Sequence, residues 1–241
     1  MSGHSKWNNI KQKKGKTDAQ RAKIFTKISR EIIVAVKEGG GDPASNSKLR
    51  DVIAKAKAAN VPNDNIKRVI DRAVGSGDNI SYEMNTYEGY GPSGIAVIVE
   101  TMTDNKNRTA SEMRHYFDKY GGNMGQEGCV SWSFDKKGVI IIEDGKLVPD
   151  AVMMDALEAG ADDFEEGEEI FEVCTAPESF STVRTALEEK GYIFLSAQIE
   201  LVPQNYIRLA DQSDQVNMEK MLSMFEDNDD VQNVWHNWDQ E

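Results

Sequence analysis

The chain is poor in the residues that build covalent and metal-centred sites. Its 241 residues include two cysteines and three histidines. Cys129 and Cys174 lie far apart, and neither a Cys-x-x-Cys nor a His-x-x-x-His pair is present. This pattern predicts two reduced thiols and no metal site. Because no nucleophile, base and orienting group can be assembled, the sequence also predicts no cofactor and no enzymatic activity.

Long apolar runs are absent as well. No stretch approaches the ~18 consecutive apolar residues that a membrane-spanning helix needs. Residues 1–7 carry no apolar stretch behind their charges, unlike a secretory signal. We therefore expect a cytoplasmic protein without a membrane partner.

What the chain does contain is a strong asymmetry of charge. Residues 1–78 hold 17 basic and 8 acidic side chains, a net charge of +9. Residues 79–241 hold 11 basic and 33 acidic side chains, a net charge of −22, which brings the whole chain to −13. A basic region on an acidic body points to a polyanionic partner, since fixed cations gain free energy by displacing the counterions of nucleic acid. The acidic remainder would repel that partner, so the contacting face is expected in the first third.

The cations are densest in residues 1–16. This segment is too polar to bury a core, and we call it the basic arm. Lysines on flexible stems suit phosphate contacts, and Trp7 offers a flat face for an unpaired base. The predicted nucleic-acid-binding residues are Lys6, Trp7, Lys11, Lys13, Lys14, Lys16, Arg21, Lys23, Lys27 and Arg30. The alternative is a solvated tail with Trp7 docked on the body, but a chain at −13 needs no further charge to stay soluble.

Three amphipathic helices are expected after the arm. A capping box at residues 17–20 opens the first, and the glycines at 39–41 end it. Apolar stripes at 49–56 and 66–73 predict the second and third helices. Short helices with short loops indicate a small helical domain. Its outer faces carry Arg21, Lys23, Lys27, Arg30, Lys55, Lys57, Lys67, Arg68 and Arg72.

After residue 78, strands and helices alternate. Strands are expected at residues 82–90, 95–101, 130–134, 138–142, 170–175, 194–201 and 231–238, and helices at 108–120, 150–158, 180–190 and 215–225. This spacing favours an α+β fold built from split βαβ, ferredoxin-like units. The elements are too many for one unit and about enough for two. We therefore expect three domains: residues 1–78, residues 79–133 with 204–241, and an inserted unit at 134–203.

Two further patterns have ordinary explanations. The acidic cluster at residues 162–169 lacks the spacing of a calcium loop and has no histidine beside it. A solvated loop flanking a strand is the favoured interpretation. Gly89, Gly91 and Gly94 are not followed by Gly-Lys-Ser/Thr, so they predict a turn and not a phosphate loop.

The polar loop at residues 103–109 is the second candidate site. It joins a strand to a helix, where backbone amides and Arg108 can grip a phosphate or the backbone of a partner. The predicted contact residues are Asp104, Asn105, Asn107 and Arg108. The alternative is plain helix capping, which we would assign to Asp104 or Asn107. Arg108 cannot cap the helix, since it has no acceptor, so its removal is expected to leave stability nearly unchanged.

Several of these segments resemble the YebC/PmpR family. The matching segments are residues 3–11, 21–27, 103–109, 121–122 and 130–134, so the resemblance runs over essentially the whole chain. Where the family often has a further basic residue, this chain has Gln12, which thins the basic patch slightly. The resemblance implies three domains with the middle one inserted.

Family members are described as probable transcriptional regulators that bind DNA, while mitochondrial relatives activate translation and bacterial relatives are linked to stalled ribosomes. The sequence therefore predicts a non-enzymatic, nucleic-acid-binding regulator of gene expression, with DNA-binding transcriptional regulation as the first interpretation. The alternative is a translation factor that binds the ribosome, ribosomal RNA or tRNA. A hydrolase working between the two α+β domains is the third.

Overall fold

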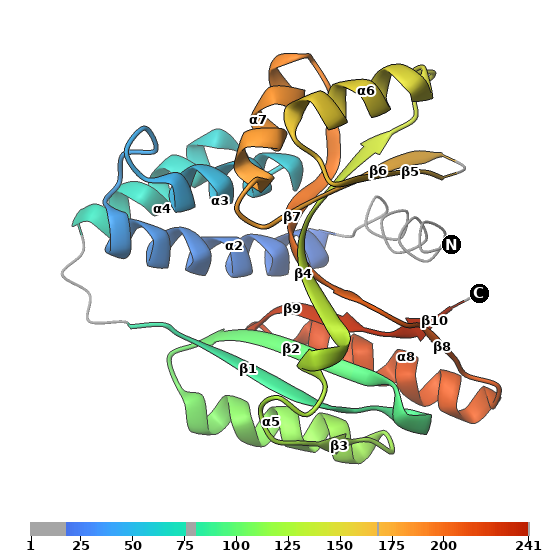
Figure 1. Ribbon diagram of the computed structural model, residues 1–241. Coiled ribbons are helices and arrows are strands. Elements are labelled where there is room, and N and C mark those ends of the chain that lie inside the picture. The colour runs from blue at the N-terminus through green and yellow to red at the C-terminus, as the bar shows by residue number, and fades with distance from the viewer. Residues whose placement is uncertain (1–17, 76–80, 168, 241) are drawn as a thin grey trace.

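The computed structural model describes residues 18–75, 81–167 and 169–240. Over these residues the chain has seven α-helices and two four-stranded antiparallel sheets, which confirms the predicted α+β fold class (Figure 1). No helix in the described part of the chain is both long and apolar enough to cross a membrane.

The N-terminal region is a bundle of three helices, as the apolar stripes predict. They are α2 (Asp18–Gly39), α3 (Ser47–Ala58) and α4 (Asn63–Gly75). Ile28, Ile32 and Val36 recur every four residues on α2 and pack against the apolar faces of the two shorter helices. The helix ends at Gly39, and Gly40 turns the chain in the left-handed region at φ +83°.

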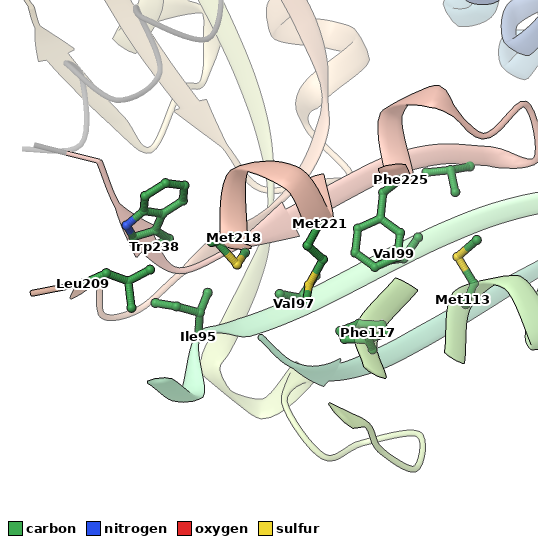
Figure 2. Packing of buried hydrophobic residues seen from close by; sticks show 11 residues of the cluster. Ile95, Val97, Val99, Met113, Phe117, Leu209, Met218, Met221, Phe225 and Trp238 are labelled. Atoms are coloured by element: carbon green, nitrogen blue, oxygen red, sulfur yellow. The ribbon is translucent and has the colours of Figure 1, made fainter. Parts of the chain in front are cut away.

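The first sheet has the strand order β3-β1-β2-β9 and joins distant parts of the chain. Its strands are β1 (Glu83–Tyr90), β2 (Ala96–Thr103), β3 (Asn123–Met124) and β9 (Val231–His236). Helices α5 (Lys106–Lys119) and α8 (Gln212–Asp227) cover one face. Figure 2 shows the core between them, where Val97 and Val99 of β2 meet Phe117 of α5 and Met221 and Phe225 of α8.

The second sheet has the order β5-β6-β4-β7 and is built from a continuous stretch of chain. Its elements are β4 (Phe134–Glu143), α6 (Pro149–Ala159), β5 (Asp163–Glu166), β6 (Ile170–Thr175), α7 (Phe180–Glu189) and β7 (Phe194–Pro203). Ile140 and Ile142 of β4 face the helices, while Val139 and Ile141 face the opposite side, as the period of a strand requires. Strand β4 runs from the first sheet to the second (Figure 1).

The predicted strand at residues 130–134 is wrong. Residues Ser131–Ser133 form a short 3-10 turn, and β4 begins only at Phe134. The buried carboxylate of Glu88 accepts the backbone N–H groups of Val130 and Ser131 at 2.9 Å, so these donors cannot join a strand ladder.

Two more predictions need correction. The acidic cluster at 162–169 is not only a loop, because Asp163–Glu166 pairs with β6 as the edge strand β5. Charged side chains on an edge strand discourage pairing with another chain. The final predicted strand is interrupted after His236, and Trp238–Asp239 forms β10, which pairs with β8 (Ile207–Arg208) in a separate two-stranded sheet.

Candidate nucleic-acid interface

The predicted interface falls into two parts of the chain. Lys6, Trp7, Lys11, Lys13, Lys14 and Lys16 lie outside the described residues, so their role stays a prediction. Arg21, Lys23, Lys27 and Arg30 lie on α2, where each has an interaction within the protein.

The cations on one face of α2 contact the C-terminal end of α8. The Lys23 ammonium pairs with Asp227 at 2.7 Å, and the two side chains are 41% and 64% exposed. Lys27 donates to the backbone carbonyl of Glu226 at 2.9 Å. Carbonyls at the end of a helix lack partners within the helix and attract cations. The basic face of α2 therefore makes contacts within the protein in this structure.

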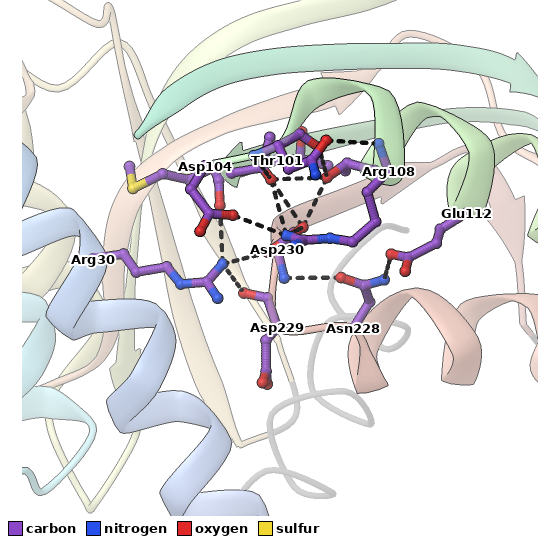
Figure 3. Close-up of polar contacts among 12 residues, drawn as sticks. Arg30, Thr101, Asp104, Arg108, Glu112, Asn228, Asp229 and Asp230 are labelled. Atoms are coloured by element: carbon purple, nitrogen blue, oxygen red, sulfur yellow. Dashed lines mark hydrogen bonds and ion pairs between the residues drawn. The ribbon is translucent and has the colours of Figure 1, made fainter. Parts of the chain in front are cut away.

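Arg30 lies among the polar contacts around Asp230 (Figure 3). Its guanidinium pairs with Asp230 at 2.6 Å, and the two side chains are only 16% and 5% exposed. It also donates to the backbone carbonyls of Met102 at 3.0 Å and Asp229 at 2.9 Å. Arg30 thus ties the helical bundle to β2 and to the turn before β9.

Asp230 gathers cations and hydroxyls from three parts of the chain. We call this group the Asp230 cluster; its members are Arg30, Thr103, Arg108, Thr109 and Asp230. Arg108 and the Thr109 hydroxyl each donate to Asp230 at 2.7 Å, and the Thr103 hydroxyl donates at 3.0 Å. Burial by itself raises the pKa of this carboxyl, but these hydrogen bonds and that from Arg30 outweigh it and lower the pKa from 3.8 to about 2.

The residue that caps α5 differs from the prediction. The side chain of Asn105, and not of Asp104 or Asn107, accepts the backbone N–H of Arg108 at 3.1 Å and caps α5. The expectation that Arg108 is structurally dispensable is also at odds with the structure. It pairs with Asp230 at 2.7 Å and with Asp104 at 3.0 Å. No local pattern could reveal this role, because Asp230 lies 122 residues further along the chain.

A second set of cations lies on α3 and α4 and faces solvent. Arg50, Lys57, Lys67 and Arg72 are exposed, and none forms an ion pair with a described residue. Arg68 is also exposed, and its guanidinium donates to the side-chain oxygen of Asn65 at 3.4 Å. Lys57, Lys67, Arg68 and Arg72 are predicted from the sequence to lie on outer helix faces, whereas Arg50 is not among the predicted cations. Only their tertiary surroundings distinguish these cations from those of α2, which contact other parts of the protein.

The described residues contain no group of three or more His, Cys, Asp or Glu side chains that could hold a metal ion. A cavity of about 110 Å³ lies between α2, α3 and the first sheet. The charged groups along it have partners already: Glu31 pairs with Lys55, and Lys48 with Glu38, both at 2.7 Å. This cavity does not lie between the two α+β domains, where the hydrolase interpretation places its site.

Comparison with known proteins gives matches over nearly the whole chain. Residues 5–76 match the model described as the TACO1/YebC protein N-terminal domain, and residues 82–238 match that of the TACO1/YebC second and third domain. A "Probable transcriptional regulatory protein" of Acetivibrio thermocellus is 60% identical over 239 residues, covering 99% of both chains. One of the same name from Caldicellulosiruptor saccharolyticus is 57% identical and covers 100% of both chains.

Among solved structures, a conserved hypothetical protein from Aquifex aeolicus has the same fold, with a TM-score of 0.83 and 42% identity. The alignment covers 93% of this chain and 92% of that one. The resemblance noted from the sequence motifs is thereby confirmed, and the chain belongs to the TACO1/YebC family.

Proposed function

We propose that this protein is a non-enzymatic, nucleic-acid-binding regulator of gene expression, and that it acts on DNA as a cytoplasmic transcriptional regulator. The observation that carries the proposal is the separation of charge: +9 over residues 1–78 against −22 over residues 79–241. A polyanion gains binding free energy from the basic residues 1–78 and is repelled by the acidic residues 79–241. The names of the relatives, which describe them as probable transcriptional regulatory proteins, support the same class of function.

The contact surface that we propose combines the basic arm with the solvent-facing cations of α3 and α4. Lys67 and Arg72 are exposed on α4, and Arg50 and Lys57 are exposed on α3. Exposed cations without intramolecular ion pairs can exchange water and counterions for phosphate at little cost. The loop residues Asp104, Asn105, Asn107 and Arg108 stay a proposed secondary contact, and all four are exposed.

This surface coincides with one of three domains that we propose for the chain. They are the arm and helical domain at 1–78, an α+β domain at 79–133 with 204–241, and an inserted α+β domain at 134–203. The two separate four-stranded sheets support this division, since β9 returns to the first sheet after β4–β7 have formed the second.

A second candidate, binding of the ribosome or its RNA, is favoured by the contacts of α2. DNA readers usually insert a helix in the major groove. The longest helix of the basic region has Lys23, Lys27 and Arg30 turned toward α8 and the Asp230 cluster. Cations on the short helices and on an arm suit the reading of backbone and shape, which folded RNA offers as readily as duplex DNA.

The salt dependence of binding tests the proposal. In the test variant, Lys11, Lys13 and Lys14 are replaced by Gln. The matched control replaces three exposed lysines of the acidic body, Lys119, Lys146 and Lys220. Each phosphate contact contributes about 0.9 to the slope of log K against log salt for duplex DNA. We expect the arm variant to lose roughly two to three from that slope and the control to keep it, and equal slopes for both variants would refute the proposal.

Competition separates the two candidates. For a transcriptional regulator, a specific duplex should outcompete random duplex by about 10³-fold or more at physiological salt. For a ribosome-associated factor, isolated ribosomes should compete well and random duplex poorly. Equal competition by heparin and every nucleic acid would leave only nonspecific charge and defeat both candidates.

A further inference from the structure

Helix α6 carries a row of apolar side chains on its solvent-facing side. The row begins at Val148, the residue before the helix, and Val148, Met154 and Leu157 are 63%, 59% and 49% exposed. Ala151 is exposed between them. Residues three apart are neighbours on a helix surface, so these four side chains form one continuous row, which we call the α6 stripe.

The stripe is a concentration of apolar groups and not a scatter of single ones. Together with Leu147, residues 147–157 hold four of the 12 large apolar side chains that are strongly exposed in the described part of the chain. Single exposed apolar residues are ordinary on a protein surface, whereas a contiguous row rimmed by polar groups marks an interaction site.

The opposite face of α6 fixes the orientation of the stripe. Val152 and Ala156 are 1% and 0% exposed and pack with Val183 and Leu187 of α7 in the core of the second sheet's unit. Figure 1 shows α6 and α7 on one face of that sheet. Turning the stripe inward would remove Val152 and Ala156 from this core, so the stripe is held toward solvent.

Carboxylates stand beside the stripe at positions that the fold determines. Asp150 and Glu158 are exposed and lie four residues before and after Met154, one helical turn away on either side. Glu166 of the neighbouring strand β5 is also exposed. Because it pairs opposite Phe171, a member of the core beneath α6, Glu166 shares the face of the sheet on which α6 lies.

The segment that carries the stripe is strongly acidic as a whole. Residues 144–166 hold eight acidic side chains and one basic one, a net charge of −7. Helix α6 itself contains no Lys or Arg. Lys190, which follows α7, pairs with Asp155 and reaches Glu158 at 3.4 Å, so it neutralises only part of this charge. The charge that remains attracts a cationic partner.

This charge selects among the possible occupants of the stripe. A second copy of the chain would bring two such acidic surfaces together, and like charges facing each other oppose association. Nucleic acid and anionic lipid are repelled for the same reason. A helix with an apolar row flanked by Lys or Arg satisfies both features. Its apolar side chains pack against the ridge of residues three apart, and its cations reach Asp150 and Glu158. Met154 suits such a contact because its unbranched side chain adapts to the shape of a partner.

We propose that the α6 stripe docks a basic amphipathic helix of a partner protein. The acidic part of the chain then has a binding role of its own, separate from the nucleic-acid contacts proposed for the basic N-terminal region. The proposal does not depend on nucleic-acid binding, and each can fail without the other.

The first experiment measures binding of a short fluorescent helical peptide made of Leu and Lys, with its Leu residues on one face, to the full chain. Met154→Ser combined with Leu157→Ser should weaken binding about 10-fold or more, because truncation of central apolar contacts has the largest effect in an interface. Val216→Ser, at an exposed apolar residue of α8, is the matched control and should leave binding unchanged.

The charges are tested in the same way. Asp150→Asn combined with Glu158→Gln should weaken binding and reduce its dependence on salt, because two of the attracting carboxylates are removed. Asp118→Asn combined with Glu219→Gln removes the same charge from exposed positions of α5 and α8 and should have less effect on both. Equal effects of the two pairs would reduce the contact to attraction by net charge and would overturn the proposal.

The peptide has its own control, with the same composition and a shuffled order that has no apolar face. This control should bind more weakly, and equal binding of both peptides, or of neither, would overturn the proposal. A photoreactive benzoylphenylalanine at position 154 then identifies the occupant in cells. We expect crosslinks to a Lys- or Arg-rich helical segment of another protein. Crosslinks to a second copy, to the basic arm of this chain or to nucleic acid would each overturn the proposal.

Discussion

The helical bundle carries two basic surfaces that differ in what their cations touch. On α2, Lys23 and Arg30 contact the end of α8 and the turn that follows it. On α3 and α4, Arg50 and Arg72 face solvent and form no ion pair with a described residue. The same kind of side chain therefore supports the fold on one surface and is available to a ligand on the other.

The α2 surface itself contains two kinds of ion pair. Arg30–Asp230 is almost fully buried, while the side chains of Lys23 and Asp227 are 41% and 64% exposed. Exposed pairs contribute about 0–1 kcal/mol, because water screens the charges and two long side chains lose entropy. Removing one partner of a buried pair costs more, because the other charge is left without compensation. Burial, and not the presence of a pair, thus decides the energetic contribution.

The largest effect is expected from removing the carboxylate at the centre of the Asp230 cluster. Asp230→Ala leaves Arg30 without its carboxylate and removes the acceptor of the Thr103 and Thr109 hydroxyls. We expect a loss of about 3–5 kcal/mol in the free energy of unfolding, measured by urea denaturation. Asp229→Ala is the matched control, since its side chain is exposed and only its backbone carbonyl is used. Equal losses in the two variants would contradict the assignment.

The same carboxyl should make stability depend on acid pH. Its pKa is about 2 in the folded protein against 3.8 for the free group, so folding is favoured by the ionised form. The contribution, roughly 2 kcal/mol, is fully present above pH 4 and is lost as the pH falls toward 2. The difference in unfolding free energy between the unsubstituted protein and Asp230→Asn should shrink over that range. A difference that stays constant from pH 4 to 2 would show that the charge of Asp230 is not responsible.

A smaller loss is expected at Arg108, which belongs to the same cluster but is 44% exposed. Arg108→Ala removes its hydrogen bonds to Asp230 and Asp104 and leaves the cap from Asn105 in place. We expect a loss of about 1–2 kcal/mol, in contrast to the unchanged stability expected from the sequence. An unchanged melting temperature with weakened nucleic-acid binding would instead restore the interpretation of Arg108 as a contact residue.

The smallest effects on stability are expected at Lys23 and Arg72. Nucleic-acid binding should distinguish these two cations better than stability does. Lys23→Ala and Arg72→Ala should each change the unfolding free energy by no more than about 0.5 kcal/mol. Arg72→Ala should reduce the slope of log K against log salt by up to about 0.9 for duplex DNA, while Lys23→Ala should have less effect. Equal effects of both on the slope would show that nucleic acid displaces the contact between α2 and α8.

Local patterns were sufficient for most elements. Apolar residues repeated every four positions predict α2, because they bury one face of a helix. The continuous apolar run at 138–142 predicts the centre of β4, because both faces of that strand are buried. The strand expected at 130–134 failed for a reason outside the segment, since the Glu88 carboxylate takes its backbone donors. The cap of α5 was assigned to the wrong residue, because Asp104, Asn105 and Asn107 all have side chains able to accept the hydrogen bond.

The sequence by itself determined most of the helices and strands, the α+β class and the separation of charge, because these depend on residue type and spacing along the chain. Only the tertiary structure decided which cations form ion pairs or hydrogen bonds within the protein. Arg30 and Asp230 are 200 residues apart, and their ion pair exists only because β9 returns to the first sheet. Likewise, the turn that carries Trp132 is held by the carboxylate of Glu88, which lies 43 residues before Ser131 in the chain. A charge or a ring acquires its role from what surrounds it, and those surroundings are set by contacts between distant segments.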